Sequence, residues 1–522
     1  MSREVIRKRS WKETWRVWLH PKAIAMLLLG FSAGLPILLI FSTLSVWLRE
    51  AGVARSAVTF FSWAALGYSF KFLWAPLVDL LPLPGLTRVL GRRRAWLLVS
   101  QLLIMSAIVW MAFVDPADSQ RNLTVMAFAA VMLGFSSATQ DIVIDAYRIE
   151  SAEESLQAML AAMYIAGYRV GMLVAGAGSL FLAGYLGTTS AAYSYPAWKL
   201  TYIAMAAAMG LGVGTTLLIN EPGVNRPASH YEYSIADYGR FLALFVFSLL
   251  AFGLTFFYSG FIFEEISARL PDVLTAGGHA GSLVSFIVEF SRFVVAVSVA
   301  AIVAGIMLFF GIVNKEMVHQ TYLEPIKDFF FRYGGKTALL LLVLIGFYRL
   351  SDIVLGVVSN VFYLDMGFSK NVIAGVTKSF GLAMTLAGGF LGGILTVRYG
   401  VNKILFLGAF LSAATNLLFM LLARTGGDVS MLTVVIGADN LSAGIATTAF
   451  IAFLSSLTNI SFTAVQYAIF SSMMTLCPKL IGGYSGTIVS AFGYERFFML
   501  TAIMGIPVLF LVIAVRKAVC RV

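Results

Sequence analysis

Charged residues and cysteines are both scarce in this sequence of 522 residues. Only 12% of the residues are charged, against roughly 25% in soluble domains, whereas 59% are hydrophobic. Too few charges remain to cover a water-facing surface, which excludes a soluble protein and indicates that lipid is the solvent. Cys477 and Cys520 are the only cysteines, so we expect no disulfide framework and no thiolate metal site. The net charge of +11 is distributed between apolar segments, which argues against a nucleic-acid partner.

Long apolar runs predict fourteen membrane-spanning helices, because a spanning helix needs about 20 mostly apolar residues. The first six are predicted at 24–48, 57–80, 95–114, 123–147, 158–183 and 199–219, two more at 241–263 and 290–313, and the last six at 337–364, 371–397, 402–423, 430–457, 462–488 and 496–515. Two sets of six helices joined by a basic linker are the plan of the major facilitator fold. We therefore expect an all-α polytopic membrane protein of 6+6 helices, with two extra transmembrane helices inserted between the halves.

The predicted domains follow from this plan. They are a basic amphipathic N-terminal segment (1–22), an N-terminal six-helix half (23–220), a linker that holds the two extra helices (221–336) and a C-terminal six-helix half (337–517). With both termini in the cytoplasm, inside segments carry about 23 lysines and arginines and outside loops about 9, the bias that orients helices. We expect segment 1–22 to lie on the anionic cytoplasmic leaflet.

Charged residues inside the predicted spans are candidates for function, since a charge in the bilayer centre costs at least about 2.5 kcal/mol. Five bases face three acids, and Asp79 and Asp439 lie nearer the ends of their spans. This surplus favours an anionic substrate, unless Lys479 reaches the interface and leaves the charges nearly balanced. The bases are Lys71, Arg169, Arg349, Lys378 and Lys479, and the acids are Asp141, Asp145 and Asp352. Polar and aromatic neighbours that suit a sugar-bearing ligand are Tyr68, Gln140, Tyr348, Asn440 and Gln466.

Asp141 and Asp145 are four residues apart and project from one face of a helix. Two such carboxylates hinder each other's ionisation, so one of them could carry the coupling proton. An ion pair with Arg169 that only joins two helices is the alternative. Near the first helices, Asp79 and the arginines of the stretch GRRR (91–94), above all Arg92 and Arg93, resemble the major facilitator loop motif that stabilises one gating state. A role of the arginines in orienting the helix alone is the other interpretation.

Several stretches resemble the AmpG-type muropeptide permeases in both halves of the chain. They are GFSAGLP (30–36), FKFLWAPLVD (70–79), GRRRAWL (91–97), SSATQDIVIDAY (136–147), GYRVGMLV (167–174), EPIKDFFFR (324–332), YRLSD (348–352), KSFG (378–381), residues 440–453 and SFTAVQYA (461–468). The resemblance implies proton-coupled import of N-acetylglucosamine–anhydro-N-acetylmuramic acid, with or without its peptide, for cell-wall recycling and β-lactamase induction. It also implies roles for Lys71, Asp141, Asp145, Arg169, Tyr348, Arg349, Asp352, Lys378 and Gln466.

Further expectations follow from the resemblance. The protein is expected in the inner membrane of a Gram-negative bacterium, as a monomer that uses the proton gradient and needs no cofactor or metal. A major facilitator transporter of another anionic or acyl-CoA-like solute stays open, because one fold hosts many functions. A membrane enzyme is disfavoured, since the pair Asp141 and Asp145 has no second acidic cluster and all four histidines lie outside the predicted spans.

Overall fold

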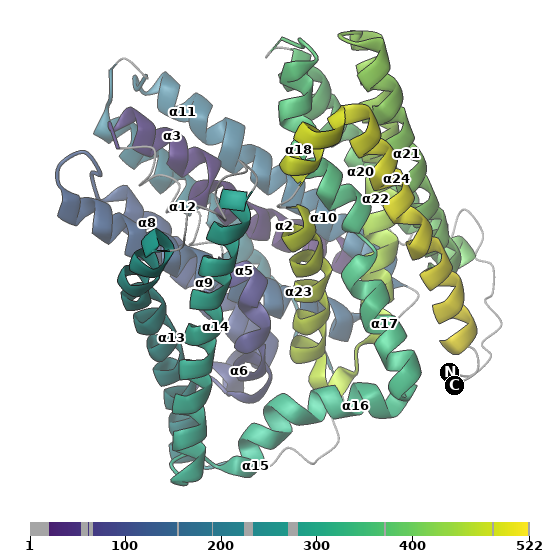
Figure 1. The fold of residues 1–522 in the computed structure, drawn as a ribbon. Coiled ribbons are helices and arrows are strands. Elements are labelled where there is room, and N and C mark those ends of the chain that lie inside the picture. Colours follow the sequence, from purple (N-terminus) through teal and green to yellow (C-terminus); the bar gives the residue numbers. More distant parts are fainter. Residues whose placement is uncertain are drawn as a thin grey trace. The chain divides into compact units, whose positions relative to one another are not determined.

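The computed structural model describes residues 20–53, 61, 66–153, 156–189, 192–223, 233–269, 280–369, 372–482 and 485–519. Every regular element in these ranges is helical (Figure 1), which confirms the predicted all-α class. Twelve of the described helices are long and apolar enough to cross a membrane, and a shorter apolar helix lies at Ile460–Leu476. The predicted span 57–80 includes residues outside the described ranges. Residues 1–19, nearly all of the predicted N-terminal segment, are outside them too.

The N-terminal half contains six segments that match the first six predicted spans in order. Their elements are α2 (Pro21–Ile40) and α3 (Ser42–Glu50); α5 (Leu66–Phe70), η2 (Lys71–Leu73) and α6 (Ala75–Leu80); α8 (Arg92–Ala112), preceded by the short α7 (Leu86–Leu90); α9 (Gln120–Ser151); α10 (Gln157–Leu173), η4 (Val174–Gly178) and α11 (Ser179–Tyr185); and α12 (Tyr195–Leu218).

The C-terminal half repeats this plan. Its elements are α17 (Gly335–Phe347) and α18 (Leu350–Asp365); η7 (Ile373–Phe380) and α20 (Gly381–Tyr399); α21 (Val401–Thr425); α22 (Val429–Leu457); η8 (Ile460–Phe462) and α23 (Thr463–Gly482); and α24 (Ser485–Val519). Two long helices, α13 (Ile235–Arg269) and α14 (Ala280–Phe309), lie between the halves in sequence, followed by α15 (Lys315–Val318), η6 (His319–Leu323) and α16 (Glu324–Tyr333).

The chain forms two compact units that differ from the predicted division. One unit joins residues 1–226 with residues 329–522, so that both six-helix halves belong to it, and the other comprises Pro227–Asp328. The second unit falls inside the predicted linker 221–336. The boundary between the two halves is therefore a feature of the sequence plan and not a division between compact units.

Four spanning segments are irregular, and three of them carry a charge at the irregular position. Lys71 lies in the 3₁₀ turn η2 between α5 and α6, and Arg349 lies at the break between α17 and α18, with φ −98° and ψ 9°. Wider π-helical turns form η4 and η7, and η7 carries Lys378. Such turns occur often at functional sites, and broken helices in transporters usually line a cavity. These charged residues therefore lie at breaks or wide turns and not within regular α-helix.

Glycine allows two helix pairs to approach closely. A Cβ atom on Gly34 or Gly167 would overlap the backbone carbonyl of Tyr168 or Leu27, so α2 and α10 touch backbone to backbone. In the C-terminal half, a Cβ atom on Gly388 would overlap the carbonyl of Leu441, which brings α20 against α22. Glycine at these positions therefore allows the two helix backbones of each pair to touch.

The two halves also pack on each other. Helix α10 contacts α20 and α22, while α23 contacts α5, η2, α6 and α9. These contacts place the deep acidic residues of α9 next to α23 of the other half, and the candidate site includes residues of these helices.

Candidate functional site

A chain of three buried charges runs through the N-terminal half. The Asp145 carboxylate on α9 pairs with Lys71 Nζ at 3.6 Å and with the Arg148 guanidinium at 3.4 Å. Lys71 and Asp145 lie on different helices, and their side chains are 10% and 12% exposed. Asp145 therefore neutralises two cations at once, and its loss would leave both with less compensation.

Asp141, one turn earlier on α9, has a different environment. It is buried, and within the described part of the chain its Oδ1 accepts a single, long hydrogen bond of 3.4 Å from the Tyr164 hydroxyl. Lys71 lies close enough for its charge to interact with the carboxylate, but no ion pair with Asp141 forms among the described residues. Tyr68 is nearby and donates to Ser137 Oγ at 2.7 Å. Of the two predicted proton carriers, Asp141 is thus the one without a bound cation.

Arg148 joins the acidic cluster to the other half of the protein. Its side chain is fully buried and donates to Ser455 Oγ on α22 at 2.8 Å and to Gln157 Oε1 at 3.0 Å. Its guanidinium also lies 5.2 Å from the ring centroid of Tyr467 on α23. Because Asp145 holds the same guanidinium, the charge state of Asp145 bears directly on contacts between the halves.

The predicted gating residues form a second link between the halves, at one end of the helices. This end is called here the Arg93 end, and it comprises Asp79, Arg93, Glu150 and Glu221. Arg93 pairs with Asp79 at 2.7 Å and with Glu150 at 2.5 Å. Asp79 Oδ2 accepts from the backbone N–H of Val465 at 3.1 Å, at the N-terminal end of α23, where a carboxylate is favoured by the helix dipole. Arg92 donates to the backbone carbonyl of Asp79. The predicted acid–arginine pairing at this loop is therefore present.

Glu221 stabilises the start of α8 at the same end. Its carboxylate accepts from the backbone N–H groups of Arg93 and Arg94, at 2.8 and 3.0 Å, which would otherwise have no helical partner. Partial burial raises the pKa of Glu221, although these hydrogen bonds oppose the shift. Glu221, which follows the first half, thus fixes the start of the helix that carries the arginines predicted to act in gating.

In the C-terminal half, Arg349 and Asp352 pair at 3.1 Å, and Arg349 also contacts the Thr447 hydroxyl. Asp352 lies in the first turn of α18, where its negative charge is favoured. Arg169, from α10 of the other half, lies close enough to Arg349 for the two positive charges to interact. Within the described residues Arg169 makes no ion pair, and its only polar contact is with Met172 Sδ at 3.9 Å. The alternative of an ion pair between Arg169 and the α9 acids is therefore not present in this structure.

A cavity of about 340 Å³ lies beside Arg349, and is called here the C-half cavity. Four of the predicted C-terminal site residues line its wall, namely Arg349, Asp352, Lys378 and Asn440. Asp439, which the hydropathy plan places nearer a span end, also lines it and accepts from Thr415 Oγ1 at 3.3 Å. Asn360 accepts a hydrogen bond from Lys378 Nζ at 3.1 Å in the same cavity.

Three predicted substrate residues lie apart from this cavity. Tyr348 is buried, stacks on Phe450 at 4.2 Å between ring centroids and donates to the Leu405 carbonyl. Gln466 accepts from Arg332 and from the Asn459 backbone N–H. Gln140 is fully buried, and neither polar atom of its amide has a hydrogen-bond partner among the described residues. Lys479 is exposed, in line with the interpretation that it reaches the interface.

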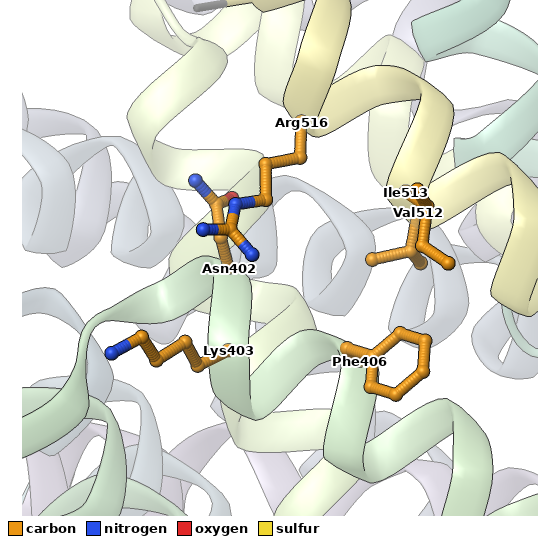
Figure 2. Close-up of a pocket in the computed structure, with 6 residues that line it drawn as sticks. All are labelled: Asn402, Lys403, Phe406, Val512, Ile513 and Arg516. Atoms are coloured by element: carbon orange, nitrogen blue, oxygen red, sulfur yellow. The ribbon is translucent and has the colours of Figure 1, made fainter.

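A smaller cavity of about 150 Å³ lies between α21 and α24 (Figure 2). Asn402, Lys403 and Phe406 line it from α21, and Val512, Ile513 and Arg516 from α24; Figure 2 shows the Arg516 side chain extending toward Asn402. None of the predicted site residues contributes to this cavity. Its wall does not combine acids and bases, unlike that of the C-half cavity.

Sequence reasoning missed three residues that the structure brings into the site, namely Arg148, Tyr467 and Asp439. Arg148 follows Asp145 by three residues, so helical periodicity places it on the same face, but its position at a predicted span end concealed its burial. Asp439 lies ten residues into α22, about 15 Å from its start, which is deep enough to count as intramembrane.

Comparison with solved structures defines the class of the fold. The proton:xylose symporter XylE of the major facilitator superfamily, bound to 6-bromo-6-deoxy-D-glucose, matches with a TM-score of 0.56 at 13% identity, over 96% of this chain and 95% of that one. The Escherichia coli fucose:proton symporter FucP gives a TM-score of 0.57 at 11% identity, over 94% of this chain and 98% of that one. The chain therefore has the major facilitator fold, as predicted.

Sequence comparison then identifies the family. AmpG 4 of Rickettsia felis is 30% identical over 94% of this chain and 96% of its own length. The anhydromuropeptide permease of Escherichia coli is 28% identical over 96% of this chain and 81% of its own. Residues 23–185 also match the family described as acetyl-coenzyme A transporter 1. The chain belongs to the AmpG family of transporters, and it is a multi-pass membrane protein.

Proposed function

We propose that this transporter imports anhydromuropeptides, N-acetylglucosamine–anhydro-N-acetylmuramic acid with or without its peptide, from periplasm to cytoplasm with protons. One observation carries the proposal. Arg169 and Arg349 come from opposite halves and lie within range of each other's charge, and of the two only Arg349 has an acidic partner among the residues that the structure describes. Two neighbouring guanidinium groups repel each other unless an anion binds, so their juxtaposition favours a carboxylate-bearing substrate between the halves. The name of the Escherichia coli relative supplies the substrate class.

The proposed orientation places both termini and the Arg93 end in the cytoplasm of a Gram-negative bacterium, at the inner membrane. The cross-half contacts of Asp79 with Val465 and of Arg148 with Ser455 then hold the cytoplasmic side together. This arrangement corresponds to a transporter closed toward the cytoplasm. Opening toward the cytoplasm requires both contacts to break, and the acid that holds Arg148 is Asp145.

The proposed mechanism is alternating access coupled to a proton on α9. Protonation of Asp145 would remove the negative charge that compensates Lys71 and Arg148, and so weaken the buried contacts of Arg148 with the other half. Asp141, without a bound cation, can hold a proton at lower electrostatic cost and pass it along the same helix face. Proton loss to the cytoplasm would restore the ion pairs and close that side again. We expect the protein to act as a monomer, in cell-wall recycling and β-lactamase induction.

A second candidate substrate is an acyl-CoA-like solute. The match of residues 23–185 to the family described as acetyl-coenzyme A transporter 1 favours it, and such a solute is also anionic. The two candidates differ in their charged groups. An acyl-CoA-like solute is charged on its phosphates, and an anhydromuropeptide on its carboxylates.

Uptake by vesicles tests the proposal. Radiolabelled anhydromuropeptide should accumulate in right-side-out membrane vesicles that contain the protein, and a protonophore should abolish accumulation. Excess unlabelled anhydromuropeptide should compete, whereas acetyl-CoA should not. The matched variants are Arg169→Gln and Arg424→Gln, of which only the first should impair uptake, because Arg424 is exposed and pairs with Glu495. Competition by acetyl-CoA alone, or uptake that is insensitive to the protonophore, would contradict the proposal.

A further inference from the structure

The C-half cavity presents uncompensated charges of both signs to one space. Arg349 and Asp352 neutralise each other at 3.1 Å. Lys378 donates to the Asn360 carbonyl oxygen at 3.1 Å, and Asp439 accepts from Thr415 at 3.3 Å. Within the described part of the chain, neither Lys378 nor Asp439 makes an ion pair. One cation and one carboxylate are therefore left to face whatever enters the cavity.

The size of the cavity limits the ligand to one part of the substrate. Its volume of about 340 Å³ is at the lower end of the range of about 300–1,000 Å³ for small-molecule sites. A disaccharide with a peptide does not fit into this space as a whole. The remaining wall offers hydroxyl and amide groups from Ser359, Tyr363 and Asn440, which can bond to either amino-acid or sugar groups.

The two charges exclude the simpler ligands. A group with negative charge alone would gain from Lys378 but would be repelled by Asp439. A neutral sugar would satisfy hydrogen bonds but would leave the partly buried Asp439 carboxylate without a counter-charge, which is costly. A ligand with an ammonium and a carboxylate attached to the same carbon atom offers a partner to both charges, since complementary charges give specificity in a partly buried site.

We propose that the C-half cavity binds the zwitterionic end of an amino acid, with Lys378 taking its carboxylate and Asp439 its ammonium. The assignment rests on the proposed function and deepens it, because a muropeptide carries such an end only when its peptide is present and terminates in an amino acid with a free amine. The cavity is then a subsite for peptide-bearing substrates, whereas the pair of Arg169 and Arg349, of which Arg349 also lines the cavity, serves all of them.

The experiment compares three ligands in vesicles. They are anhydromuropeptide whose peptide ends in diaminopimelate with its distal amine free, the same compound with that amine acetylated, and the disaccharide without peptide. Acetylation removes the positive charge of the amine and adds a small acetyl group. In the wild type we expect it to raise the KM of uptake about tenfold, because the Asp439 carboxylate then lacks its partner.

Variants that remove one charge each identify the residue that binds the ammonium. Asp439→Asn should bring the ratio of the two KM values close to one, whereas Lys378→Gln should raise both KM values about tenfold and keep their ratio. Asp118→Asn, an exposed acid outside the cavity, is the control and should keep the wild-type ratio. Protein amounts are compared by size-exclusion chromatography in detergent.

Four outcomes would overturn the inference. An unchanged KM ratio in Asp439→Asn means that this carboxylate does not contact the ammonium. Loss of accumulation of all three ligands in Asp439→Asn assigns this residue to the proton path instead. If the wild type takes up the ligands with no preference for the free amine, the proposed subsite is refuted while the proposed function holds. If the wild type takes up none of them, the proposed function and the proposed subsite are refuted together.

Discussion

Replacement of Arg148 by methionine should open the Arg93 end. The structure places this guanidinium between Asp145 of its own half and Ser455 and Tyr467 of the other. Methionine retains much of the side-chain volume but has neither the charge nor the donors. The closed arrangement then loses a link between the halves, whereas the open arrangement, in which water can solvate the arginine, loses little.

The magnitude follows from the two cross-half contacts. A hydrogen bond from a charged donor contributes about 1.5–3 kcal/mol, and a cation–π contact about 0.5–2 kcal/mol. Water compensates part of both in the open state, so a net effect of about 2 kcal/mol is reasonable. Since 1.4 kcal/mol corresponds to a factor of ten, the open fraction should rise about 30-fold.

Cysteine labelling measures this fraction. A variant without Cys477 and Cys520 receives a reporter, Ala464→Cys, at a position on α23 that is 1% exposed. Inside-out vesicles are treated with a membrane-impermeant maleimide, and Arg148→Met should accelerate labelling about 30-fold. Arg424→Met, an exposed arginine paired with Glu495, is the control and should not. Equal labelling rates in Arg148→Met and the parent would refute the reasoning.

Three further predictions concern the proton carrier, the anion site and helix packing. Asp141→Asn should abolish accumulation against a gradient but preserve substrate exchange, since no ion pair depends on this carboxylate; retained accumulation in vesicle assays would contradict its role. Arg169→Gln should raise the KM for anionic substrate at least about tenfold without lowering thermal stability in detergent. Gly34→Ala should destabilise the protein by about 1–3 kcal/mol, because its Cβ would overlap the Tyr168 carbonyl, whereas Gly184→Ala, which points into open space, should leave the melting temperature nearly unchanged.

The fold could be predicted largely from sequence because its signal is local. Lipid offers no hydrogen-bond partner to the backbone, so an apolar run of sufficient length must form a helix, whatever packs against it. The order of six, two and six runs then predicted the major facilitator plan.

The sequence by itself also determined which residue types lie in the membrane interior, since the cost of burying a charge makes each intramembrane Lys, Arg and Asp conspicuous. Only the tertiary structure decided their partners. Asp145 selects Lys71 and Arg148 and not Arg169, and Arg148 bonds to Ser455, 307 residues away along the chain. Such pairings depend on how whole helices pack, and periodicity along one helix contains no information about the residue that faces it from another. For the same reason, only the folded chain shows that Asp439 and Lys378 line the same cavity.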